Sequence, residues 1–347
     1  MTEAQAVPPE GQVLQMVMGG WISTAIAALS KHDVPDVLQK HGPMTATRMV
    51  EIGGVDAVPD ALQRLLRAAA SFGFLTEDSE GRFGPTELCK VLTSDSDTPI
   101  KKMVEAMATH WLRIQTALYD AVRTGKNQSK ELYGKDWWSW LNDHPRELED
   151  FGEAMKSNSH NSLLGVVEHC DLTGVASICD VGGSFGHMAV ALLEKYPDLR
   201  ASVLEVPDLI PVARKSFVIE DPAVADRLEY VGGDMFSAVP PAEVYVLKHI
   251  IHDWEDDYCT RLLTNCHQSM QGNGRVVSVD SVLPPMGDTG GTPAKLLDVL
   301  MLSGINGRER TEAQWKELYR ATGFEVTRIT PLQDNFGTSI IEGAKRG

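Results

Sequence analysis

Polar residues that can do chemistry follow apolar runs in the second half of the sequence. Ile178–Val206 reads ICDVGGSFGHMAVALLEKYPDLRASVLEV, in which one run ends in Asp180 and a second run, after a helical segment, ends in Glu205. The turn after Asp180 is rich in glycine, which lets a ligand approach the backbone, and the second acid can hold the hydroxyls of a ribose. The pattern predicts a nucleoside-binding site.

The dinucleotide fingerprint G-x-G-x-x-G is not met in this turn. In the frame that starts at Gly182, the second and third glycines are replaced by Ser184 and His187, and the frame that starts at Gly183 fails at Phe185 and Met188. The fingerprint glycines allow a pyrophosphate to approach the backbone. A pyrophosphate cradle, and with it a nicotinamide oxidoreductase, is therefore not predicted.

Two further apolar runs end in polar groups, in GGDMF at Gly232–Phe236 and in LKHIIHDWEDD at Leu247–Asp257. Asp234 can accept a hydrogen bond from an exocyclic amine such as the adenine N6, and Met235 can lie against a base. An acid that follows a strand also commonly caps a helix, so both interpretations of Asp234 stay open.

Strands alternate with helical patterns from about residue 175 onward, which predicts a doubly wound, mostly parallel α/β sheet with ligands at the carboxyl ends of its strands. The apolar runs lie at Ser177–Val181, Ala201–Val206, Leu228–Val231, Val244–Leu247, Val276–Asp280, Phe324–Ile329 and Ser339–Ile341. The four polar strand ends are therefore expected to line one edge of this sheet.

Residues from about 10 to 160 are expected to be mainly helical, with a winged-helix pattern that ends in a hairpin around Ser79–Gly84. Such a module either binds DNA or serves as a scaffold for dimerisation. The second interpretation is favoured because the helix in the recognition position offers only Arg64 and Arg67 as basic residues. We predict two domains, at residues 1–165 and 166–347.

The composition of the chain excludes some classes of binding partner. The 347 residues carry a formal net charge of -16, and nucleic acid and anionic membranes both attract a basic face, so neither is an expected partner. The five cysteines form no close pair, which indicates reduced thiols in the cytoplasm. No secretion signal is recognised at the amino terminus.

The most apolar window is Val13–Leu29, which also contains Gln15, Ser23, Thr24 and two glycines. It falls short of the about 20 apolar residues of a membrane-crossing helix. We expect a buried helix instead. Because its apolar residues lie all round, a second subunit is expected to cover part of it.

Taken together, the sequence resembles the S-adenosylmethionine-dependent O-methyltransferases of small aromatic compounds, which include plant caffeate and isoflavone enzymes and bacterial antibiotic-pathway enzymes. The resemblance rests on DVGGSFG, LEVPDLI, GGDMF, LKHIIHDW and GRERTEAQW, which occur in the family's order over nearly the whole chain. It implies a Rossmann-like catalytic domain, an N-terminal winged-helix-like dimerisation domain and a homodimer. It also implies cofactor contacts at Gly182, Glu205, Asp234, Met235 and Lys248.

The resemblance places the general base at His252, which an acid at Asp280 and another at Glu309 would orient. A neutral imidazole can take a phenolic proton, and an acid bonded to one ring nitrogen leaves the other free to act. Ser184 replaces a third family glycine, Glu205 replaces a frequent Asp, and Asp280 is shorter than the Glu of plant members, which weakens its contact with the histidine unless something compensates.

Other interpretations of this segment stay open. A lone histidine at a helix start is more often structural, although the matching acids favour the catalytic role. His249 and His252 with nearby acids are a weak metal-ligand set, so we predict no metal, and Asp253 is expected to cap the following helix.

The resemblance also places substrate contacts at Phe151, Met155 and Met301, since a Met against a ring face is favourable. The alternative is that these are core residues at helical spacing. The function expected overall is methylation of a hydroxyl on an aromatic or polycyclic small molecule. Nitrogen or carbon methylation and cofactor-assisted decarboxylation or hydroxylation remain alternatives.

Overall fold

The computed structural model describes residues 7–97, 100–334 and 336–346, without the side chains of residues 158–161 and 216. The chain forms two compact units, which we describe separately. The first contains Met1–Thr116 and Trp138–His160, and the second contains Ala117–Trp137 and Asn161–Gly347. The domain boundary after residue 165 stays a prediction.

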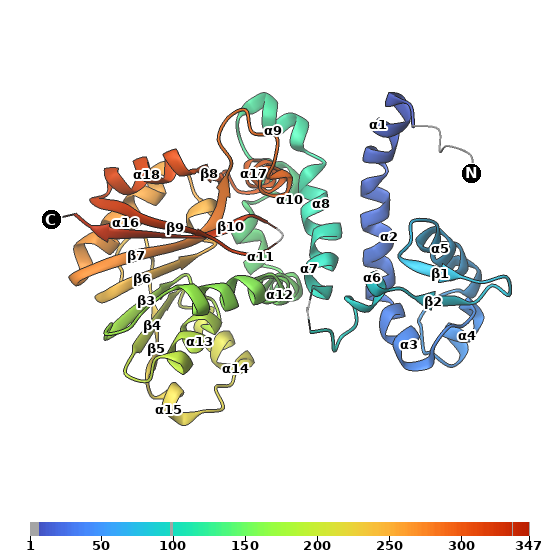
Figure 1. Cartoon of the computed structure of the whole chain (residues 1–347), viewed down its shortest axis with the longest axis horizontal. Coiled ribbons are helices and arrows are strands. Elements are labelled where there is room, and N and C mark those ends of the chain that lie inside the picture. Colours follow the sequence, from blue (N-terminus) through green and yellow to red (C-terminus); the bar gives the residue numbers. More distant parts are fainter. Residues whose placement is uncertain (1–6, 98–99, 335, 347) are drawn as a thin grey trace. The chain divides into compact units, whose positions relative to one another are not determined.

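The second unit is built on one large sheet, with strand order β5-β4-β3-β6-β7-β10-β9 (Figure 1). Strands β3 to β7 run parallel, whereas β10 is antiparallel to both of its neighbours. This confirms the mostly parallel α/β sheet. The strands are β3 Ser177–Val181, β4 Arg200–Glu205, β5 Leu228–Gly232, β6 Ala242–Lys248, β7 Met270–Leu283, β9 Phe324–Pro331 and β10 Thr338–Lys345, with the short β8 Arg310–Thr311 paired to β7.

Helices cover both faces of this sheet. Side chains alternate between faces along a strand, so Val276 packs with α16 and α18 while Val277 packs with α13 and the end of α12. The helices of this unit are α9 Leu118–Thr124, α10 Ser129–Tyr133, α13 His187–Lys195, α14 Ile210–Ser216, α15 Pro222–Ala225, α16 Asp256–Ser269, α17 Thr292–Gly304 and α18 Glu312–Ala321, with the 3₁₀ turn η2 Ile251–Asp253. Two helices, α11 Trp137–Asn142 and α12 Pro145–His169, cross the division between the units.

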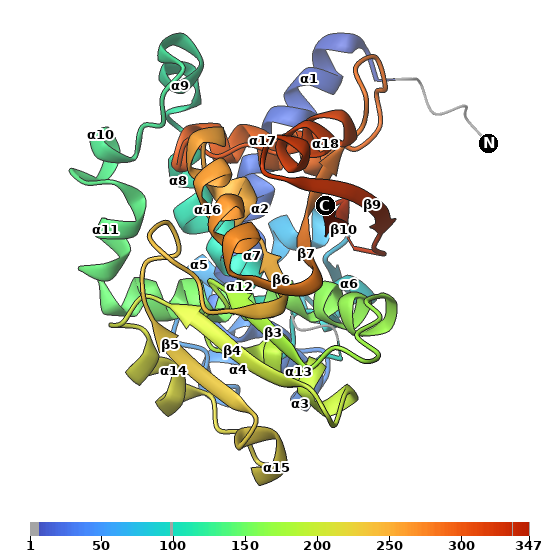
Figure 2. The same ribbon diagram turned by 90° about the vertical axis from the view of Figure 1, so that its left-hand side faces the viewer.

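The order of the strands fixes where a ligand can bind. Strands β5, β4 and β3 lie side by side, and the chain then crosses to β6 on the other side of β3 (Figure 2). In open α/β sheets, the crevice at such a reversal, at the carboxyl ends of the strands, holds the ligand. Asp180, Glu205 and Lys248 lie at or next to these ends.

The first unit contains the predicted helical pattern followed by a hairpin. Its helices are α1 Pro9–Val17, α2 Gly19–Lys31, α3 Val34–His41, α4 Ala46–Glu51, α5 Pro59–Ser71, α6 Glu87–Lys90, α7 Lys101–Ala106, the π-helix η1 Met107–Trp111 and α8 Leu112–Gln115. Strands β1 Leu75–Glu77 and β2 Phe83–Pro85 pair antiparallel. Leu62 and Leu66 of α5 pack in one core with Leu75 and Phe83.

Within one chain the segment Val13–Leu29 is buried only towards the end of α2, at Ala27 and Leu29, and its expected cover by a second subunit stays a prediction. No residue of α1 is buried within the chain, and Trp21 of α2 is 73% exposed. The 23-residue segment Pro9–Lys31 contains an 18-residue window with a mean hydropathy of 1.5, so the expectation that it falls short of a membrane-crossing helix is wrong by length and composition alone. The polar residues in the window did not lower its hydropathy enough to exclude such a helix.

Tyr319 provides a test of how the C-terminal strand is held. Its buried hydroxyl lies 2.8 Å from the Ser278 hydroxyl on β7 and 3.2 Å from the Ile341 carbonyl on β10. We expect Tyr319→Phe to lower the free energy of unfolding by about 1–2 kcal/mol, because buried partners lose a hydrogen bond. Urea unfolding measures this, with the exposed Tyr258→Phe as the control. Equal midpoints for the two variants would contradict it.

Candidate active site

The turn after β3 requires glycine at its first position. Gly182 has φ 66°, a conformation that side chains disfavour, and a Cβ there would lie 2.5 Å from Cδ1 of Ile250. Its N–H donates to the Leu204 carbonyl at 2.8 Å, which fixes the turn against β4. The turn therefore needs glycine beside Ile250 and is held in place against β4.

Glu205 is bound to the same turn. Its Oε2 accepts from the N–H of Ser184 at 3.0 Å, and its Oε1 accepts from the N–H of Val206 at 2.8 Å. Burial raises the pKa of Glu205, although both hydrogen bonds oppose this. Ser184 has φ 52°, which explains why glycine is preferred there. The side chain of Ser184 leaves the contact with the longer acid intact.

Asp234 caps its own turn. One carboxylate oxygen accepts from the N–H of Phe236 at 2.9 Å and the other from the Ser237 hydroxyl at 2.7 Å. No helix follows Asp234 in the described chain before β6, so it caps a turn and not a helix, and contact with an adenine stays a prediction. Met235 packs at the edge of the core formed with α16.

Lys248 ends β6 among buried acids. Burial lowers the pKa of its ammonium group, and the charges of Asp180, Asp280 and Asp253 oppose that effect. Burial likewise raises the pKa of Asp180 to about 7. One oxygen of Asp180 has no hydrogen-bond partner among the described residues. At this edge of the sheet, the negative charge of the buried carboxylates is therefore not fully balanced by hydrogen bonds and positive charges.

His252 lies in the turn η2 and is 8% exposed. Its Nδ1 is 2.7 Å from Oε1 of Glu309, whereas Asp280 Oδ1 is 3.9 Å away. Glu309 therefore makes the predicted orienting hydrogen bond, and the shorter Asp280 does not. The other ring nitrogen, Nε2, lies 3.3 Å from Oδ1 of Asp253.

These acids change the charge state expected for the imidazole. Burial lowers the pKa of His252, but the charges of Glu309, Asp253 and Asp280 outweigh it and raise the pKa to about 10. The sequence implies a neutral imidazole at this position, but the carboxylates that surround the ring keep it protonated at neutral pH. A phenol also ionises at about pH 10, so the phenol and the imidazolium have nearly equal pKa values and the proton can move between them at little cost in free energy.

Asp253 is a residue whose role the sequence interpretation missed. The helix α16 begins after Glu255, so Asp253 does not cap it. Instead, its carboxyl is next to His252 Nε2, and burial raises the pKa of that carboxyl to about 6. In the sequence, the only sign of this role was that Asp253 directly follows His252.

The cluster His249, His252 and Asp280 offers ligand atoms that all lie within 4.8 Å of one another. Both nitrogens of His252 already lie against other acids, at Glu309 and Asp253. A metal would have to displace the hydrogen bond from Glu309. We therefore do not assign a metal centre to these residues.

Comparison with known proteins identifies the family. Residues 115–325 match the O-methyltransferase domain family, and residues 14–95 match the O-methyltransferase dimerisation domain. The chain belongs to the O-methyltransferase family. It is an S-adenosylmethionine-dependent enzyme and contains a dimerisation domain.

Individual relatives share this assignment over almost their full length. The phenazine O-methyltransferase of Lysobacter antibioticus is 30% identical, covering 99% of both chains. The mitomycin biosynthesis 6-O-methyltransferase of Streptomyces lavendulae is 31% identical, covering 95% of this chain and 93% of that one. The solved mitomycin 7-O-methyltransferase has a TM-score of 0.86 at 30% identity, with 97% of each chain covered.

Another solved relative was captured with ligands. An O-methyltransferase from neocarzinostatin biosynthesis, in complex with S-adenosylmethionine and 2-hydroxy-5-methyl naphthoic acid, has a TM-score of 0.79 at 25% identity. The alignment covers 93% of this chain and 95% of that one.

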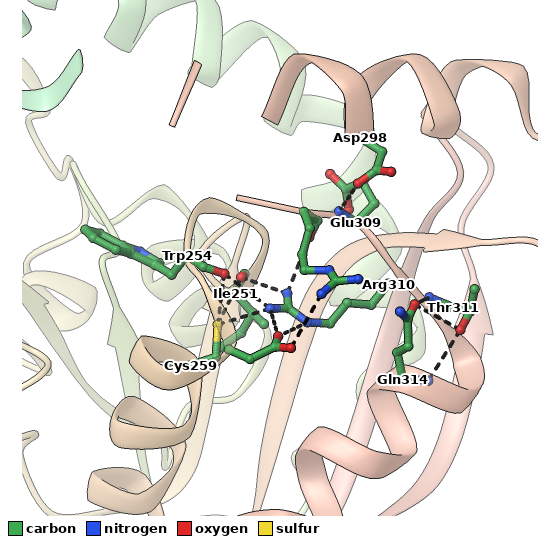
Figure 3. Close-up of polar contacts among 10 residues, drawn as sticks. Ile251, Trp254, Cys259, Asp298, Glu309, Arg310, Thr311 and Gln314 are labelled. Carbon is green, nitrogen blue, oxygen red and sulfur yellow. Dashed lines mark hydrogen bonds and ion pairs between the residues drawn. The ribbon is translucent and has the colours of Figure 1, made fainter. Parts of the chain in front are cut away.

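In the methyltransferase, Arg310 ties the histidine turn to the strand that follows Glu309 (Figure 3). Its guanidinium is 2% exposed and donates to the carbonyls of Ile251 and Trp254 and to Asp256. On the other side, the N–H of Glu309 donates to Asp298 Oδ1 at 2.8 Å. These contacts fix both partners of the His252–Glu309 bond, and nothing in the sequence marked Arg310 as buried.

The predicted substrate residues of the methyltransferase lie on two helices, with Phe151 and Met155 in the first compact unit and Met301 in the second. Phe151 and Met155 are half-buried one turn apart on α12, where the Phe151 ring meets Trp138 edge-on at 5.8 Å between centroids. Met301 is buried on α17. Their contact with a substrate stays a prediction.

A substitution at Gly307 tests whether methyl transfer depends on the position of the loop that carries Glu309. A Cβ at Gly307 would lie 2.0 Å from the backbone oxygen of His252, which also accepts from the N–H of Arg308. We expect Gly307→Ala to push the loop away and to lower kcat/KM for methyl transfer about 100-fold, as misplacement of a catalytic group by about 1 Å does. Gly20→Ala, where a Cβ meets nothing within 4 Å, is the control, and wild-type activity in both variants would refute the dependence.

Proposed function

We propose that this enzyme methylates a hydroxyl group of an aromatic or polycyclic small molecule and that His252 is its general base. The observation that carries the proposal is the buried 2.7 Å contact between His252 Nδ1 and Glu309. An acid bonded to Nδ1 fixes the tautomer and orients Nε2 toward the hydroxyl proton.

The high pKa of His252 suits a weak acid such as a phenol. Its proton passes to Nε2 as the oxygen attacks, and Glu309 stabilises the imidazolium that forms. Alignment of the acceptor oxygen with the methyl carbon supplies most of the remaining acceleration, on the order of several kcal/mol. Asp253, beside Nε2, adds negative charge that favours the protonated ring.

The methyl donor is proposed to bind along the strand ends. The glycine turn at Gly182 is proposed to face the donor with its backbone, and Glu205 is proposed to accept hydrogen bonds from the ribose hydroxyls. Asp234, Met235 and Lys248 are proposed to make the remaining contacts. The incompletely compensated acid at this edge fits a positively charged ligand. When bound, the cofactor supplies a methyl group already activated by its sulfonium charge.

The acceptor class follows from the relatives. Phenazine and mitomycin enzymes are similar over nearly the whole chain, and another solved relative holds a naphthoic acid. A flat, fused-ring acceptor from natural-product biosynthesis is therefore proposed for this chain. Phe151, Met155 and Met301 are proposed to contact it, since thioethers pack well on ring faces.

The enzyme is proposed to work as a homodimer in the cytoplasm. The exposed apolar residues of α1 and α2, which are Val13, Leu14, Met16, Val17, Met18 and Trp21, lie in or beside the segment that matches the dimerisation domain. A large exposed apolar patch marks an interaction surface. The five buried free thiols suit a reducing compartment.

We expect His252→Ala to bind S-adenosylmethionine with unchanged affinity but to lower kcat/KM about 10²–10⁴-fold with phenolic acceptors, the usual contribution of a general base. Glu309→Gln should cause a smaller loss, because the base remains while its orientation weakens. Calorimetry measures cofactor binding, and a mass increase of one methyl across a panel of fused-ring phenols measures transfer.

The pH dependence of that reaction is a further check. Since only the neutral imidazole accepts a proton, wild-type kcat/KM should rise with pH up to about 10. Because the phenol itself ionises at about pH 10, His252→Ala should also gain activity with pH, and its deficit relative to the wild type should narrow once the acceptor is ionised. Unchanged turnover of His252→Ala at neutral pH would refute the base, and methylation of nitrogen or carbon in the panel would redirect the proposal.

Disruption of the apolar N-terminal surface tests the dimer. Trp21→Glu together with Met16→Glu should convert the enzyme to monomers, because two charges would be buried at the interface. Light scattering after size-exclusion chromatography reports the mass. Met286→Glu, at a fully exposed apolar side chain of the other unit, should leave the mass unchanged. A dimer that survives the double substitution would place the interface elsewhere.

A further inference from the structure

Three polar atoms of His249 and Asp280 are left without partners in the densest part of the site. Both carboxylate oxygens of Asp280 and Nδ1 of His249 are buried and have no hydrogen-bond partner among the described residues. Leaving such groups unpaired costs about 1–3 kcal/mol each. An interaction that satisfies them is therefore expected.

We propose that Asp280 holds its proton and donates it to Nδ1 of His249, so that Glu309 and Asp253, without Asp280, are the charged acids that act directly on the catalytic base. Only the expected effect on methyl transfer rests on the proposed function; the location of the proton does not. It assigns His249 as a positioning residue.

Geometry brings the two groups together. His249 Nδ1 lies 3.7 Å from Asp280 Oδ1, a gap that is longer than a hydrogen bond and that the proposed bond has to close. The backbone of His249 is fixed, because its N–H donates to the Val279 carbonyl at 3.0 Å, directly before Asp280. His249 also takes φ 54°, a conformation that is costly for histidine. The chain thus holds this ring beside Asp280 in spite of strain.

The charge balance also favours a proton on one acid. Asp180, Asp253, Asp280 and Glu309 are buried around only Lys248 and His252, since Arg310 bonds to Asp256. Two carboxylates beside one imidazole do not both ionise easily. Glu309 has the short bond to the ring, so Asp280, which has no such bond, is the acid that keeps its proton.

The surroundings of Asp280 agree with this assignment. Burial raises the pKa of Asp280 to about 8, with the charges of Glu309 and Asp253 adding to it and those of His252 and Arg310 opposing it. Burial, Lys248 and His252 lower the pKa of His249 well below its usual value, so the ring is neutral and can accept. The other titratable groups that face Asp280 are Lys248, Cys259 and Tyr319.

Infrared difference spectroscopy tests the proton without any substrate. The wild-type protein minus Asp280→Asn should show the carbonyl stretch of a protonated carboxyl at pH 7, and this band should titrate away through about pH 8. His249→Leu should shift that midpoint to lower pH, because the acceptor is lost. His249→Asn should restore it, since its amide oxygen replaces Nδ1 and Asn tolerates positive φ. Absence of the band at pH 7 overturns the proposal.

Methyl transfer gives the second readout. Asp280→Asn resembles the protonated acid in shape and charge, so it should keep at least about ten times more kcat/KM than Glu309→Gln, which loses the orienting charge. Equal losses in these two variants would overturn the neutral role of Asp280. If no acceptor is methylated by the wild type, the proposed function fails while the infrared result still stands.

A bound metal is the competing outcome. Elemental analysis of the purified wild-type protein should find no stoichiometric transition metal. A metal present at one equivalent, and lost in both His249→Leu and Asp280→Asn, would mean that the metal and not a proton satisfies these atoms. That result would overturn the proposal.

Discussion

The contact between His252 and Glu309 is the constraint around which the catalytic unit is arranged. The two residues are 57 positions apart and come from a 3₁₀ turn and a loop, neither of which is rigid by itself. Arg310 makes them rigid, because its buried guanidinium bonds to the carbonyls of the turn while its backbone continues from Glu309. Buried charges of this kind contribute little to stability, so their presence here is best explained by the geometry they fix.

Much of the fold was predictable because the strands are nearly continuous apolar runs separated by helical patterns. Strand β3 begins and ends at the predicted residues, whereas β7 extends beyond its prediction at both ends, and its added start, 271–275, is polar or glycine and has no apolar signal. The N-terminal helices were misjudged for a different reason. Apolar residues indicate that a surface is covered, but they do not show whether the same chain or another covers it.

The site was predictable in its members but not in its electrostatics. The family motifs identified His252, Asp280 and Glu309, and the structure brings them together. The position of Asp253 against Nε2 and the burial of Arg310 depend on how two loops close on each other, which no local pattern encodes. The pKa of His252 depends on these same contacts, so the sequence alone did not show that the ring is protonated at neutral pH.

The excess of acid at the strand ends links the chemistry to the choice of ligand. A pyrophosphate would add negative charge where Asp180 and Glu205 are already buried with raised pKa values. A sulfonium centre does the opposite, since its charge stabilises carboxylates in a medium of low dielectric constant. The same positive charge would lower the pKa of His252, because like charges repel. Binding of the methyl donor would thus bring the base nearer to its neutral form at the moment when a proton must be removed, which couples cofactor occupancy to activation of the acceptor.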